Sequence, residues 1–89
     1  MLSATERKQL KARAHKLEPM VMIGTKGLTD EVVKEVDLAL KAHELIKVRA
    51  AALEREQRAD ALKALCERTG AESVQAIGKV FVIYRKRDE

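Results

Sequence analysis

Apolar and polar residues alternate along this chain of 89 residues with periods that predict three helices and four strands. Ser3 and Glu6 have the spacing of a capping box, and Pro19 pushes the residue before it away from helical angles. We therefore expect the first helix to run from Ser3 to about His15. Its apolar side, which should dock on the core, holds Leu10, Ala14 and Leu17.

The next segment contains a short apolar run at residues 20–23, whose nearly continuous hydrophobicity predicts an inner strand. Thr29 then caps a second helix, which begins with two acids and should end near His43. The stripe that this helix should bury comprises Val32, Val33, Val36, Ala39 and Leu40.

Clean alternation at residues 45–50 predicts another strand. Its inward side chains should be Ile46, Val48 and Ala50, and its outward cations Lys47 and Arg49. A third helix should run from about Glu54 to Thr69, with Gly70 as a left-handed C-cap. The side chains that it should bury are Leu62, Leu65 and Cys66. Two last strands, at residues 73–77 and 80–85, should form a tight hairpin through Gly78-Lys79.

This order of elements predicts an α/β fold, a two-layer sandwich of three helices and a mixed four-stranded sheet. The length fits one domain, which we place at residues 1–86 with a short tail at 87–89. No secretory signal and no apolar run of about 18 residues is present. The single Cys66 has no partner for an internal disulfide, which favours a cytoplasmic protein with a core thiol.

The net charge of +4 is unevenly distributed along the chain. Residues 1–29 hold six basic and two acidic side chains and so account for the whole excess. On the first helix, Lys8, Lys11 and His15 project opposite the apolar side, with Arg7 and Lys16 beside them. Such a basic end indicates a polyanionic partner, although a merely solubilising helix face explains the charge alone equally well.

A Gly-Thr-Lys-Gly loop, Gly24 to Gly27, lies between the first strand and the second helix. Its glycines allow a sharp turn and a close approach to a ligand, and the unpaired N–H groups of the following helix attract phosphate. Lys26 adds a mobile charge at the tip. A Gly-x-x-Gly loop that clamps a nucleic-acid backbone is the device of KH domains, whereas the simpler alternative is an ordinary turn.

Other chemistry has little support in the sequence. The chain has no nucleophile and base at a recognisable spacing, no phosphate-binding P-loop, and too few histidines and cysteines for a zinc site. We therefore expect no enzyme activity, cofactor, metal or small-molecule substrate. The aromatic residues are Phe81, which we expect in the core, and Tyr84. They cannot form a platform for stacked bases, so any RNA should be recognised by its backbone and shape.

The blocks at residues 10–19, 23–29 and 43–48 resemble the CRM domain (chloroplast RNA splicing and ribosome maturation), whose bacterial stand-alone form is the YhbY family. Residues 74–85 are similar to the last hairpin of that family. The resemblance implies a fold like the C-terminal domain of translation initiation factor three and RNA binding through a KH-like loop. Because bacterial members are associated with precursors of the large ribosomal subunit, the single copy here favours that role.

The expectation is a monomeric, cytoplasmic, ribosome-associated protein that binds large-subunit ribosomal RNA and assists assembly. Its predicted RNA-binding residues are Gly24, Thr25, Lys26, Gly27, Lys8, Lys11, Lys16, Lys47 and Arg49. Two alternatives stay open: a general or small-RNA chaperone, and a protein adaptor that docks an acidic partner. Whether the cations of the first helix and of the second strand adjoin is not determined by the sequence.

Overall fold

Seven elements follow one another in the predicted order in a computed structural model that describes residues 2–86. They are α1 (Ala4–Ala14), β1 (Pro19–Met22), α2 (Asp30–His43), β2 (Leu45–Arg49), α3 (Arg55–Thr69), β3 (Glu72–Ile77) and β4 (Val80–Tyr84). The sheet order is β1-β2-β4-β3, with β1 parallel to β2 and the other neighbours antiparallel. The predicted α/β class with a mixed four-stranded sheet is therefore confirmed, and the expected tail lies outside the described residues.

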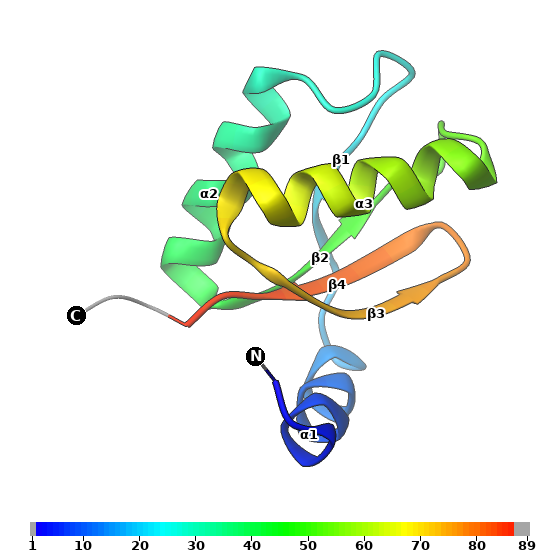
Figure 1. Ribbon diagram of the computed structural model, residues 1–89. Coiled ribbons are helices and arrows are strands. Elements are labelled where there is room, and N and C mark those ends of the chain that lie inside the picture. The colour runs from blue at the N-terminus through cyan, green and yellow to red at the C-terminus, as the bar shows by residue number, and fades with distance from the viewer. Residues whose placement is uncertain (1, 87–89) are drawn as a thin grey trace.

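Helices cover the two faces of the sheet unequally. Figure 1 shows α2 and α3 together on one face and α1 on the other. The larger core lies under α2 and α3 and includes the fully buried Leu40, Ile46, Val48, Leu65 and Phe81. The smaller core lies under α1 and comprises Leu10, Ala14, Leu45, Val74 and Val82, with Tyr84 packed beside it. The sheet is thus closed on one face by α2 and α3 and only partly covered on the other by α1, which adds a third, partial layer to the two-layer sandwich that the sequence predicts.

The predicted inner position of β1 is wrong. β1 is an edge strand, because within residues 2–86 β2 is the one strand that pairs with it. The chain leaves β1, passes through α2 and returns as the parallel strand β2. Val21 points into the larger core, whereas Met20 and Met22 are 49% and 68% exposed. A continuous apolar run therefore does not require cover on both sides, and flexible methionine side chains are tolerated at the surface.

Two buried stripes also differ from prediction. Leu17 is 37% exposed rather than docked, because α1 ends at Ala14 and the helical spacing does not extend to it. On α3 the buried side chains are Ala61, Leu65 and Thr69, of which Leu65 is fully buried, while Leu62 and Cys66 only pack against the core from its margin. Burial of Thr69 is possible because its hydroxyl donates to the carbonyl of Leu65 at 2.7 Å.

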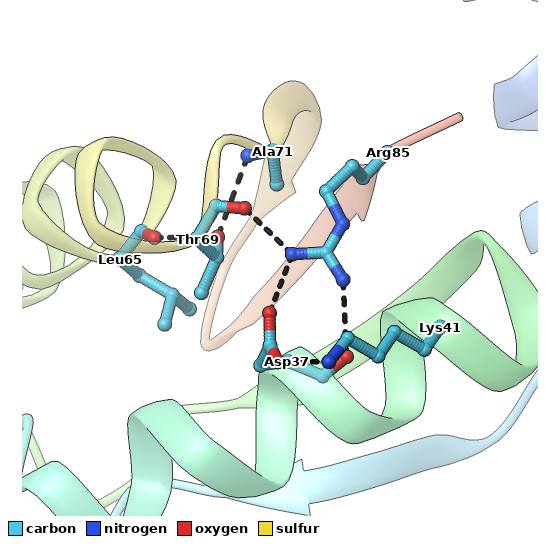
Figure 2. A network of polar contacts seen from close by, with 6 residues as sticks. All are labelled: Asp37, Lys41, Leu65, Thr69, Ala71 and Arg85. Carbon is cyan, nitrogen blue, oxygen red and sulfur yellow. Dashed lines mark hydrogen bonds and ion pairs between the residues drawn. The ribbon is translucent and has the colours of Figure 1, made fainter. Parts of the chain in front are cut away.

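A polar clamp, defined as Arg85, Asp37 and Thr69, joins the end of β4 to both helices of the larger layer (Figure 2). The Arg85 guanidinium donates to the Asp37 carboxylate at 2.6 Å, to the Thr69 carbonyl at 2.7 Å and to the Asp37 carbonyl at 3.1 Å. Lys41 approaches the other carboxylate oxygen of Asp37 at 3.3 Å. The hydrogen bond from Arg85 holds the pKa of Asp37 below its ordinary value of 3.8.

Candidate nucleic-acid interface

The Gly24–Gly27 loop is a tight turn at the end of β1. The Gly27 N–H donates to the Gly24 carbonyl at 3.0 Å, and Gly27 has a φ of +76°, which side chains rarely adopt. Gly24 has an ordinary φ, and a Cβ placed there would meet no atom within 4 Å. The turn geometry therefore requires the second glycine but not the first. Thr25 and Lys26 are exposed at the tip.

The beginning of α2 is less open to an anion than the sequence suggested. The Thr29 hydroxyl already accepts a hydrogen bond from the N–H of Val32 at 3.2 Å. Asp30 and Glu31 occupy the first turn, and the Asp30 carboxylate contacts Arg68 at 2.6 Å. These carboxylates compete with a phosphate for the positive end of the helix dipole. The expected contribution of this helix end is therefore weakened. The Gly27 N–H already donates to the Gly24 carbonyl, so Lys26 is the charged donor that the loop offers.

The two predicted cations of β2, Lys47 and Arg49, lie on the partly covered face of the sheet, each level with a different set of residues on the neighbouring strands. Arg49 pairs with Met22 of β1 and Val80 of β4, and Val80 pairs with Ile77 of β3. Because side chains alternate along a strand, Lys47 points to the same face one row away, about 7 Å along β2. The Ile23 N–H donates to the Arg49 carbonyl at 2.8 Å, so Arg49 adjoins the start of the glycine loop.

The structure brings one predicted cation of α1, Lys11, and one of β2, Lys47, together in a groove of about 280 Å³ between α1 and the sheet. Lys11 comes from α1, His15 directly follows that helix and Lys47 comes from β2, over a floor that contains Val80 and Val82. The question left open by the sequence is thereby answered, since Lys11 and Lys47 line the same groove. Lys8 is exposed one helical turn before Lys11 on the same side of α1.

Lys16 does not join this groove. It lines a different hollow of about 590 Å³ at the end of α1, together with Arg13 and with His43 from the end of α2. The tip of the glycine loop is also separate from α1, since Figure 1 shows them at opposite ends of β1. Arg49 lies between α1 and the tip of the loop. Lys11, Lys47, Arg49 and the Gly24–Gly27 loop therefore form an extended surface, called the track below, rather than one pocket.

None of the six predicted cations is paired with a carboxylate within residues 2–86. These cations are Lys8, Lys11, Lys16, Lys26, Lys47 and Arg49. Other basic side chains, such as Arg68 and Arg85, are held in ion pairs at 2.6 Å. The unpaired set therefore keeps its full charge available for an anionic partner.

The groove also contains residues that the sequence pattern does not mark as RNA-binding. Gln75 of β3 lines it, as does His15, which the sequence places only on the basic side of the first helix. No pattern in the sequence marks Gln75, because its position depends on the pairing of β3 with β4. Arg13 and His43 were likewise not predicted to lie beside Lys16.

Cys66 has the environment of a structural thiol. It packs against the margin of the larger core, and burial, with a smaller contribution from the Glu72 carboxylate, raises the pKa of its thiol. A raised pKa disfavours the thiolate that a nucleophile needs. Within residues 2–86 no cluster of three metal-ligating side chains occurs, and none of the helices there is long and apolar enough to cross a membrane.

Comparison with known proteins gives a consistent result. The chain is 43% identical over 88 residues to an RNA-binding protein of Haemophilus influenzae, covering 99% of this chain and 89% of that one. It is 34% identical over 89 residues to a protein of Bacillus subtilis named as a probable RNA-binding protein, covering 100% and 93%. The solution structure of a hypothetical protein from Staphylococcus aureus superimposes with a TM-score of 0.87 at 34% identity, covering 100% of this chain and 93% of that one. The CRS1 / YhbY (CRM) domain profile matches residues 2–85, and the chain therefore belongs to this family.

Proposed function

We propose that this protein binds RNA of the large ribosomal subunit precursor and assists its assembly without catalysing a reaction. The observation that carries the proposal is the track of unpaired cations that leads from α1 across β2 to the glycine loop. Three relatives are named as RNA-binding or probable RNA-binding proteins, which supports RNA as the polyanion. The ribosomal part rests on the role of the bacterial members that the sequence resembles.

In the proposed complex the cations contact phosphates, and Gly24 and Gly27 let the loop approach the backbone closely. Thr25 and Lys26 contact the backbone from the tip of the loop. Lys8 on α1 and Lys16, just beyond the end of that helix, extend the electrostatic footprint. Such contacts position the protein on folded RNA but carry little sequence information. The fit is to shape and charge, as expected for a sheet without exposed aromatic pairs.

The test is sedimentation of a cell lysate through a low-salt sucrose gradient, with detection of this protein in the fractions. We expect it to travel with large-subunit particles or their precursors and to leave them when the salt is raised. A protein that stays at the top of the gradient contradicts the ribosomal proposal and favours a small-RNA chaperone or an adaptor. Nuclease treatment separates these two, because an adaptor complex with an acidic protein survives it.

A variant with Thr25→Asp and Lys26→Asp tests the loop separately. We expect weaker binding to all RNAs and a smaller dependence of affinity on salt, by about one in the log–log slope for each lost phosphate contact. Unchanged affinity with an intact fold would remove the loop from the interface.

A further inference from the structure

We propose that the groove between α1 and the sheet receives one unpaired nucleotide of the bound RNA. The base would lie over β3 and β4, with the adjoining phosphates on Lys11 and Lys47. This inference rests on the proposed RNA binding and names the part of the RNA that the groove takes.

The groove has the apolar surfaces that the faces of a base need. Its floor is formed by Val80 and the buried Val82, and one wall by Ile77, which is 61% exposed in the free protein. Bases that leave a stack are held between apolar or aromatic side chains in their binding pockets. The volume of about 280 Å³ lies just below the usual range for ligand sites, so one nucleotide suits the groove and a helix does not.

Gln75 supplies the polar group that a base edge requires. It pairs with Val82 across the sheet and lines the groove from β3. Its amide both donates and accepts hydrogen bonds, and glutamine amides bind base edges in this way. An aliphatic ligand would leave this amide without a partner.

Charge argues for an anionic occupant. Lys11, His15 and Lys47 stand around the groove, and its lining includes no carboxylate. Three other hollows on the described surface each include one or more acids, among them Glu18, Glu72 and Asp60 respectively. The groove is thus the hollow among these four in which a phosphate meets cations without opposition.

Continuity with the track explains how the rest of the RNA is held. Lys47 and Arg49 are two residues apart on β2, and Arg49 adjoins the glycine loop through the Ile23–Arg49 hydrogen bond. A strand that is paired at the loop can therefore place a neighbouring unpaired nucleotide at the groove. Single-stranded loops and bulges are also the parts of RNA that expose their bases.

The experiment compares two RNA hairpins that differ by one bulged nucleotide, with 2-aminopurine at the bulge as a fluorescent probe. Their affinities are measured by fluorescence anisotropy for the wild-type chain, for Ile77→Thr and for the control Leu38→Gln. Thr keeps the β-branched shape that suits a strand. Leu38 is a matched control because it is 65% exposed on α2, over the other face of the sheet.

We expect the wild type and Leu38→Gln to bind the bulged hairpin about five-fold or more tightly than the paired one, with a change in 2-aminopurine emission. Ile77→Thr should lose most of this preference while it binds the paired hairpin as before. Equal wild-type affinity for both hairpins would overturn the inference and leave the proposed function standing. Failure of the wild type to bind either hairpin would overturn both.

Discussion

Neutralising Lys11 and Lys47 together tests whether the groove cations contact phosphate. Both ammonium groups line one groove although they lie on different elements, and neither is paired with a carboxylate in the described structure. Replacement by glutamine keeps most of the side-chain length and removes one charge. The two single variants and the double variant therefore report on two adjacent contacts with little change in packing.

The magnitude follows from counterion release. Each phosphate contact contributes about 0.7–0.9 to the slope of log affinity against log salt. At about 0.15 M salt this corresponds to roughly four- to six-fold in affinity for each lysine and about 15- to 30-fold for both. The double variant should lower the slope by about 1.4–1.8.

The assay is fluorescence anisotropy with a labelled RNA hairpin at several salt concentrations. Lys63→Gln is the control because it removes the same charge from an exposed position on α3, on the far side of the sheet from the groove. We expect the control to keep nearly the wild-type slope. If Lys63→Gln lowers the slope as much as Lys47→Gln does, binding depends on net charge alone and not on the positions of the groove lysines.

Three further predictions concern the scaffold that holds the track. Arg85→Met removes three hydrogen bonds of the partly exposed polar clamp. We expect thermal denaturation to show a free energy of unfolding lower by about 2 kcal/mol and a midpoint lower by about 10 °C. An unchanged midpoint would contradict a stabilising role of the clamp. Because the folded pKa of Asp37 is depressed, its contribution is present above its ordinary value of 3.8 and is lost as pH falls below it. The free energy of unfolding should therefore fall less steeply with decreasing pH in Asp37→Asn than in the wild type. Identical dependence on pH in the two proteins would argue against this contribution. Gly27→Ala should cost about 1 kcal/mol in chemical denaturation whereas Gly24→Ala costs less than about 0.5, and equal costs would contradict the turn geometry.

Elements were predictable where the sequence itself contains the physical signal. Ser3 and Glu6 form the expected capping box, with hydrogen bonds of 3.1 and 3.2 Å. Gly70 has the left-handed φ of 74° expected of a C-cap. Such features depend on residues within one turn of each other. The burial of Phe81 and the alternation along β2 were likewise readable from local pattern.

The order of the strands and the helices that cover each face of the sheet were not predictable, because both depend on contacts between distant segments. The run at Met20 and Met22 has the same pattern whether the strand is inner or at an edge, and only the pairing with β2 alone exposes it. Leu17 has the helical spacing that continues the apolar stripe of Leu10 and Ala14 in the sequence, but the helix ends at Ala14.

The candidate site was partly readable for the same reason. The glycine loop is contiguous in sequence, whereas the meeting of Lys11 with Lys47 requires α1 to cross the sheet. Lys16 follows the same basic pattern as Lys11 but lies at another hollow, because the helix has ended before it. Charge pattern therefore indicates the kind of partner, and the tertiary structure decides which charges act together.

RNA binding along the track can be observed residue by residue if the 15N-labelled protein is titrated with an unlabelled RNA hairpin and every backbone amide is followed by NMR. We expect the amides of Gly24–Gly27, Arg49, Lys47 and Lys11 to shift together and to saturate at one RNA concentration. Shifts confined to the outer faces of α2 and α3, with the track unaffected, would contradict this expectation.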